Sequence, residues 1–158
     1  MTRRDDEHDI RALVQRYNAL GDAGRFEEFL SLFAVDAEYH VEGIDDPFVG
    51  RAGISRMLDD ARSDLLAWRP GERIHLRHFT ATHVVEFDGP DSATGSLYYQ
   101  ALMPHGLDHW GRYHDRYRRD GDAWRFAERR ERRDGMVEGG WCWFLWGPDG
   151  VRTRVRPG

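Results

Sequence analysis

The sequence predicts an α+β domain in which helices come first and a curved antiparallel sheet follows. Two observations support this fold class. Up to residue 66, apolar residues recur every three or four positions, as on one face of a helix. From residue 74 onward the pattern changes to alternation, which is typical of strands. Because the helices precede the strands and do not alternate with them, they are expected to pack together on one face of the sheet.

Three helices are expected in the N-terminal half. The first covers residues 6–20; acidic residues suit its N-terminus, and two glycines end it. A shorter second helix at 26–33 carries four apolar residues on one face, and an extended segment follows at 38–43. The third helix runs from about 51 to 66.

Four strands are expected after residue 73. Turn-forming sequences such as Asp-Gly-Pro and Asp-Gly-Asp separate them, and they cover 74–87, 93–103, 109–119 and 124–133. The chain has no repeat, linker or low-complexity stretch. Residues 1–158 are therefore expected to form a single domain whose core spans about 8–133.

The segment 139–158 forms a tail with an aromatic part and a basic part. Residues 141–146, Trp-Cys-Trp-Phe-Leu-Trp, are too apolar for a free terminus, and residues 150–158 form a loose basic end. In an extended conformation the aromatic part would present two apolar faces, of which one sheet can cover only one. A pocket lid, a last strand and a subunit contact all stay open, and a homodimer or homotrimer is expected.

The composition excludes several classes of function. The net charge of −5 gives no reason to expect nucleic-acid binding, and no apolar run approaches the ~20 residues that span a membrane. All 23 basic residues are arginines, so a Schiff-base lysine and a Walker-type phosphate loop are excluded. Cys142 is the only cysteine, which rules out an intrachain disulfide. With no signal peptide recognisable at the N-terminus, a cytoplasmic location is expected.

The strand expected at 74–87 has an unusual face. Alternation places Leu76, His78, Thr80 and Thr82 on the same side. This side is apolar at its start and then carries an imidazole and two hydroxyls, as the wall of a pocket does. The alternative is that His78 is a structural histidine that bonds to a backbone carbonyl.

The other histidines do not predict a metal site. On an unbroken strand, His75 and His83 point away from His78, so one strand face supplies fewer than the three or four ligands that zinc needs. No metal is therefore expected. On the third strand, His109 shares a face with Tyr113 that can reach the pocket.

Several motifs occur in an order and at a spacing that resemble the SnoaL-like branch of the nuclear transport factor 2 superfamily. They cover most of residues 8–133. The matching stretches are Tyr17–Asp22, Phe29–Tyr39, Phe48–Ile54, Arg77-His78, Gly111–Asp115 and Trp124–Arg129. The resemblance implies a cystatin-like cone, in which a strongly bent sheet wraps around three N-terminal helices and leaves a pocket at its open end.

The resemblance also implies a catalytic pair. Scytalone dehydratase, lindane dehydrochlorinase and bile acid 7α-dehydratase work without a cofactor and use an aspartate at the end of the first helix and a histidine on the strand after the third. Asp22 and His78 match these positions. A histidine titrates near neutral pH, and a carboxylate beside it fixes the tautomer and stabilises the imidazolium. Without the family match, Asp22 would be an ordinary turn residue between two glycines.

Further residues are candidates for binding the substrate. They are Tyr17, Tyr39, Thr82, Tyr99, Tyr113 and Arg129. Arg129 matches a frequent family arginine, although its neighbours in the sequence are also consistent with a surface charge. The chain departs from scytalone dehydratase at the second pocket histidine, where it has Tyr98 and Tyr99.

The expected function is that of a cofactor-independent lyase or isomerase, of the dehydratase, dehydrochlorinase or cyclase type. Its substrate would be a cyclic, mostly apolar small molecule of the kind found in polyketide or aromatic metabolism. One alternative is a non-catalytic ligand-binding module or a module like a dioxygenase β-subunit. Another is an epoxide hydrolase, for which Asp115 and Arg129 are the nearest candidates.

Overall fold

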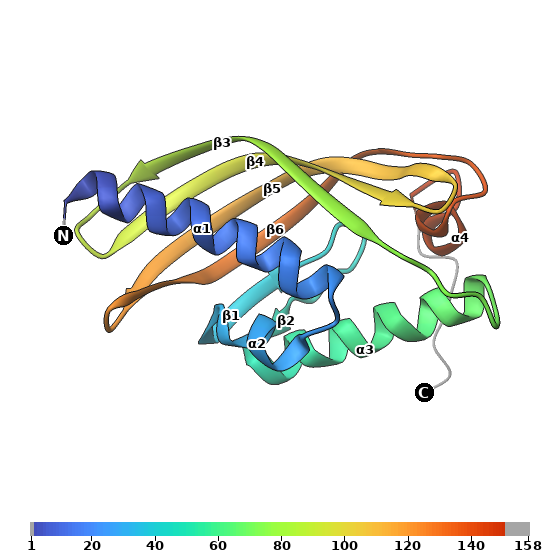
Figure 1. Cartoon of the computed structure of the whole chain (residues 1–158), viewed down its shortest axis with the longest axis horizontal. Coiled ribbons are helices and arrows are strands. Elements are labelled where there is room, and N and C mark those ends of the chain that lie inside the picture. The colour runs from blue at the N-terminus through green and yellow to red at the C-terminus, as the bar shows by residue number, and fades with distance from the viewer. Residues whose placement is uncertain (1, 151–158) are drawn as a thin grey trace.

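The computed structural model describes residues 2–150, which form four helices and six strands (Figure 1). In chain order the elements are α1 (Arg3–Asp22), α2 (Phe26–Ser31), β1 (Phe33–His40), β2 (Phe48–Val49), α3 (Gly50–Trp68), β3 (Arg77–Phe87), β4 (Ser92–Met103), β5 (Gly106–Asp120), β6 (Ala123–Met136) and α4 (Trp141–Trp146). None of the helices within residues 2–150 has the length and apolarity needed to cross a membrane.

The strands form one curved, open sheet in the order β2-β1-β6-β5-β4-β3. Neighbouring strands are antiparallel, except that β1 and β6 run parallel. The long strands β3 to β6 arch over α1, and α2 and α3 lie beneath the end of the sheet that the short strands β1 and β2 form (Figure 1). The predicted α+β fold, with N-terminal helices inside a curved sheet, is confirmed.

Helix α1 begins earlier and ends later than the apolar spacing indicated. Thr2 and Asp5 form a capping box at its start: the Asp5 amide donates to the Thr2 hydroxyl, and the Thr2 amide donates to the Asp5 carboxylate. Ile10 and Val14 are fully buried against the sheet. At the other end the helix continues through Gly21, so that Asp22 is its last residue. This position holds the Asp22 side chain at the edge of the sheet.

Phe33 was expected at the end of the second helix, but it is the first residue of β1. The Phe126 amide donates to the Leu32 carbonyl, and the Arg51 guanidinium donates twice to the Phe33 carbonyl. These contacts with β6 and α3 stop the helix at Ser31, because they use carbonyls near its end. Tertiary contacts therefore override the local helical spacing.

Strand β3 contains a bulge that corrects the expected facing of its second half. Thr82 has a positive φ of 55°, and the pairing with β4 shifts between Ala81 and Val84. His78 lies on the inner face as predicted. Beyond the bulge the alternation reverses, so Thr82 is exposed and His83 is turned inward. The expectation that His83 points away from the face of His78 is wrong, because it assumed an unbroken strand.

The aromatic part of the tail is a short helix and not a strand. In α4, Trp141, Cys142, Leu145 and Trp146 are buried, and they pack with Met103 in a second hydrophobic cluster. The chain's own residues thus cover the two faces that an extended segment would have left open. The inference of an oligomer from those two faces therefore loses its support. The loose basic end expected at 150–158 lies outside the described residues from 151 onward.

Candidate functional site

A cavity of about 460 Å³ lies between the helices and the inner face of the sheet. Phe29, Phe48, Leu58, Leu65 and Trp146 contribute to its mostly apolar wall. Its volume falls in the range of pockets that enclose a small organic ligand. Helix α4 forms part of the wall, so the tail closes a pocket of its own chain.

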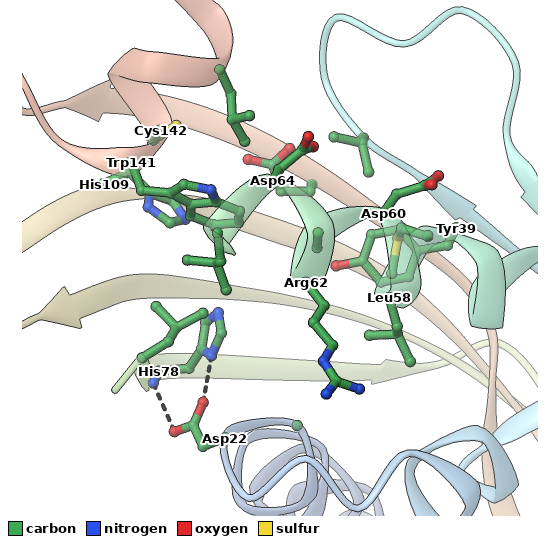
Figure 2. A pocket seen from close by; sticks show the side chains of 18 of the residues that line it. Asp22, Tyr39, Leu58, Asp60, Arg62, Asp64, His78, His109, Trp141 and Cys142 are labelled. Carbon is green, nitrogen blue, oxygen red and sulfur yellow. Dashed lines mark hydrogen bonds and ion pairs between the residues drawn. The ribbon is translucent and has the colours of Figure 1, made fainter. Parts of the chain in front are cut away.

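Asp22 and His78 meet at one edge of this cavity (Figure 2). The His78 Nδ1 lies 2.7 Å from Asp22 Oδ1, and the His78 backbone amide donates to Asp22 Oδ2 at 2.9 Å. Their side chains are only 20% and 12% exposed. Because Asp22 holds both the ring and the backbone of His78, the ring has a fixed orientation and its Nε2 is left without a partner among the described residues.

Two tyrosines from different elements form a second polar point in the wall. The hydroxyls of Tyr17, on α1, and Tyr39, on β1, are 2.9 Å apart, and both residues line the cavity. Burial raises the pKa of Tyr39 well above its usual value, so this phenol stays protonated. The pair holds two hydroxyl protons and uses one between its oxygens. The other can be donated to a ligand.

Arg129 lies behind this tyrosine pair and does not line the cavity. It is fully buried, with its guanidinium 4.1 Å from the ring centroids of Tyr17 and Tyr113. Its Nε and Nη2 donate to the buried Asp115 carboxylate at 2.8 and 2.6 Å. Burial would lower the pKa of Arg129, but the charge and hydrogen bonds of Asp115 raise it well above its usual value. Arg129 is thus neither a surface charge nor part of the cavity wall. Its cation packs against the rings of Tyr17 and Tyr113 on the side away from the cavity.

A second carboxylate faces the cavity from β6. The Tyr99 hydroxyl donates to Glu131 Oε1 at 2.5 Å, and the Glu42 amide donates to Glu131 Oε2 at 3.1 Å. Arg133 lies beside them, 4.2 Å from the Trp146 ring and only 8% exposed. Tyr99 therefore lines the cavity as expected, but its hydroxyl proton is already used.

A second imidazole lines the cavity on β5, where alternation had placed His109 on a face that can reach the pocket. The His109 ring lies beside Trp141 of α4 (Figure 2). Its Nδ1 is 2.8 Å from the carboxylate of Asp108. On β4 only Tyr99 faces the cavity, because Tyr98 is exposed on the other face of the strand. The second imidazole comes instead from β5, the next strand of the sheet.

Asp108, His109 and Cys142 offer ligand atoms that lie within 4.8 Å of one another, which is a spacing that a metal ion can use. The carboxylate is already occupied, however, because it accepts the backbone amides of Trp141 and Cys142. Burial also raises the pKa of the Cys142 thiol to about 12, and a metal would need the thiolate. The arrangement favours a hydrogen-bonded cluster over a metal site.

Of the remaining candidates, Tyr113 lines the cavity, whereas Thr82 and Asp115 do not. Thr82 is exposed at the bulge. Asp115 is turned to the core, where it accepts hydrogen bonds from Arg129 and from the Tyr117 hydroxyl, and His83 bonds that same hydroxyl at 3.1 Å. The pair on which epoxide hydrolysis would depend is therefore an internal ion pair.

The structure adds cavity residues that the sequence did not single out. Asp60, Arg62 and Asp64 of α3 line the cavity, with Arg62 on the opposite side of the helix from the two aspartates (Figure 2), and Glu131 and Arg133 line it from β6. Inward alternation on β6 could have signalled the last two only if it was counted from Arg129. Counted from the buried Phe126 it gives the opposite face, because the pairing with β5 shifts between Phe126 and Glu128. The charged residues of α3 carried no such signal, since their spacing is also that of a solvated helix face.

Solved structures share this architecture. A nuclear transport factor 2-like protein with a cystatin-like fold from Novosphingobium aromaticivorans is 26% identical (TM-score 0.67; 86% of this chain and 84% of that chain covered). From the same organism, a candidate scytalone dehydratase is 17% identical (TM-score 0.71; 84% and 87%). The β subunit of a candidate aromatic-ring-hydroxylating dioxygenase from that organism is 19% identical (TM-score 0.66; 85% and 92%).

These structural likenesses at 17% and 19% identity show the fold alone. No curated protein matches the sequence significantly. The model of the SnoaL-like domain, in contrast, matches residues 2–130, which is most of the chain. On this match, and with the cone and its cavity in place, the chain belongs to the SnoaL-like domain family.

Proposed function

We propose that the protein is a cofactor-independent lyase that eliminates water, or a comparable leaving group, from a cyclic and mostly apolar ketone. The observation that carries this proposal is the Asp22–His78 pair at the edge of an apolar cavity. The SnoaL-like fold serves ligand binding as well as catalysis. A histidine whose ring is held by a carboxylate, with Nε2 directed at a ligand site, favours catalysis.

The first step is removal of a proton next to the carbonyl. His78 Nε2 takes the proton, and Asp22 stabilises the imidazolium that forms. Asp22 is well suited to this task, because its carboxylate accepts hydrogen bonds only from His78 among the described residues. Its charge is therefore fully available to the imidazolium.

The carbonyl oxygen gains negative charge as the proton leaves. The spare hydroxyl proton of the Tyr17–Tyr39 pair can stabilise this charge, and the Arg129 cation behind the rings strengthens that donor. The apolar wall excludes water and so makes these electrostatic interactions stronger.

The proposal is tested with two probes. α-Tetralone has a single carbon with acidic protons beside its carbonyl and no leaving group, so its hydrogen–deuterium exchange in D₂O reports proton removal alone. Its β-hydroxy derivative reports elimination, because loss of water gives fluorescent α-naphthol. We expect the wild type to catalyse both, and His78→Asn to lower both by about 100-fold or more, the usual contribution of a general base.

His75→Asn is the matched control, because His75 is an exposed histidine of the same segment and does not line the cavity. It should leave both rates within about twofold of the wild type. Equal rates in the wild type and His78→Asn would overturn the proposal. An inert wild type that binds the tetralones and co-purifies with an oxygenase subunit would instead support the non-catalytic alternative.

A further inference from the structure

Asp108 is the most heavily bonded carboxylate near the cavity. Its side chain is fully buried and accepts three N–H groups, from His109 Nδ1 at 2.8 Å and from the backbone amides of Trp141 and Cys142 at 2.6 and 3.1 Å, while His105 Nε2 lies 3.2 Å from it. Burial would raise the pKa of Asp108, but these partners lower it below its usual value, so it is ionised. One carboxylate thus joins β5 to the first turn of α4.

The His109 ring is fixed between this carboxylate and the aromatic wall. Its centroid lies 5.8 Å from the Tyr99 ring and 6.1 Å from the Trp141 ring, and its side chain is 12% exposed. Since Nδ1 is held by Asp108, the proton on Nδ1 is fixed and Nε2 is the atom left for a ligand. His109 Nε2 has no partner among residues 2–150.

Two histidines of the cavity wall are therefore held in the same way. His78 and His109 both line it, both are held at Nδ1 by a carboxylate, and both keep Nε2 unpaired. Elimination needs two proton transfers at different atoms of the substrate, one from carbon and one to the departing oxygen. Two imidazoles can carry out these transfers at separate atoms, whereas a single imidazole has to carry the same proton from carbon to oxygen.

The surroundings of the two carboxylates assign the roles. Within residues 2–150 the Asp22 carboxylate accepts only from His78, so it stabilises an imidazolium formed there, as a base requires. The charge of Asp108 is shared among His105, His109 and two amides. It therefore stabilises a positive charge on His109 less than Asp22 does on His78, so an imidazolium at His109 gives up its Nε2 proton more readily, as an acid requires.

Building on the proposed lyase function, we propose that His109 is a second catalytic residue, which protonates the leaving group, and that Asp108 positions it only while α4 is docked over the cavity. The substrate C–H proton passes to His78 Nε2, and the electrons of that bond form the new C=C bond. His109 begins this step as an imidazolium, with one proton on Nδ1 held by Asp108 and one on Nε2. The C–O bond breaks with its electron pair on oxygen, and the Nε2 proton of His109 completes a water molecule. Solvent then returns a proton to His109 and takes one from His78.

The coupling to α4 follows from Gly140. A Cβ atom at this position would lie 2.4 Å from Asp108 Oδ1, so only glycine lets the chain approach the carboxylate closely enough for both amides to bond. When α4 leaves, Asp108 loses two of its three hydrogen-bond donors and His109 loses the Trp141 ring. Closure of the cavity and orientation of His109 are therefore one event.

The test compares two histidines that lie beside the same carboxylate. His109→Asn keeps an amide donor near the Nδ1 position and removes Nε2. His105→Asn is the matched control, because His105 packs on Trp68 and does not line the cavity. We expect His109→Asn to lower α-naphthol formation by about 100-fold while exchange into α-tetralone stays within about threefold of the wild type, and added imidazole to restore elimination in His109→Gly. His105→Asn should change neither rate by more than about threefold.

The positioning role of Asp108 has its own readout. Asp108→Asn should lower elimination more than exchange and should raise the rate at which iodoacetamide labels Cys142 by about tenfold, because the thiol is buried only while α4 is docked. Elimination that survives in His109→Asn, or a loss of exchange equal to the loss of elimination, would overturn the role of His109 and leave that of His78 standing. An exchange rate that does not depend on His78 would instead reject the proposed function.

Discussion

The buried ion pair between Asp115 and Arg129 predicts a large and specific loss of stability when it is broken. Both side chains are fully buried, and two hydrogen bonds of 2.8 and 2.6 Å join them. Asp115→Asn keeps the shape of the side chain but leaves the Arg129 cation without its counter-charge. Breaking such a pair costs about 3–5 kcal/mol. With a urea m-value of about 2 kcal/mol/M, the unfolding midpoint should fall by roughly 2 M.

The same two strands supply the control for this measurement. Arg112 on β5 and Asp134 on β6 form an ion pair of 2.9 Å whose side chains are 50% and 38% exposed. Asp134→Asn should cost less than about 1 kcal/mol, since water screens the pair. If Asp115→Asn does not fold, the double variant Asp115→Asn with Arg129→Met should recover stability, because no unpaired charge remains. Equal costs for Asp115→Asn and Asp134→Asn in urea titrations would refute the reasoning.

Three further predictions follow from other parts of the chain. Gly140→Ala should displace α4 and so expose Cys142, whose pKa burial raises to about 12. Mass spectrometry should then show that iodoacetamide labels this thiol about tenfold faster than in the wild type, and unchanged labelling would show that α4 tolerates the methyl group. Burial lowers the pKa of His83 to about 4 from about 6.5. The stability that neutral His83 contributes is therefore fully present above pH 6.5 and is lost as the pH falls to about 4. His83→Gln should flatten this part of the plot of urea midpoint against pH, and parallel plots for the two proteins would contradict this prediction. A homo-oligomer stays a prediction, and its expected contact is the outer face of the sheet, where Phe79 and Tyr98 are 52% and 54% exposed. Arginine at both positions should lower the particle mass measured by light scattering, and a monomeric wild type would contradict the prediction.

Regular periodicity accounts for what could be predicted of the fold. Apolar spacing located the three N-terminal helices, and alternation located the four long strands within a few residues. Both signals are local and repeat several times, so a single exception does not hide them. The first half of β3 illustrates this, since alternation placed His78 on the inner face as the structure has it.

Single local departures were beyond reach. The bulge at Thr82 inserts one residue without any change in composition, so His83 was assigned to the wrong face and Thr82 to the pocket. The six residues of α4 are apolar all round and have no period, so a strand and a helix fit them equally well. Their helical form depends on Asp108, which lies 33 residues away from Trp141 in the chain.

The candidate site was only partly visible for a similar reason. Asp22 and His78 are 56 residues apart, and it was the resemblance to the SnoaL-like branch that paired them. Arg129 stands among several arginines, and nothing in the sequence distinguishes the one that is buried from those that are not. Its burial depends on Asp115 from the neighbouring strand, a contact that only the register of β5 and β6 creates.

Helix α4 is the last element of the chain, and every strand precedes it. The sheet can therefore pair and enclose α1 before the last wall of the cavity is in place. A chain at that stage of folding has an open cavity and an Asp108 without its two backbone donors. Translation that stopped at residue 139 would release a polypeptide with its sheet intact but with an unfinished site.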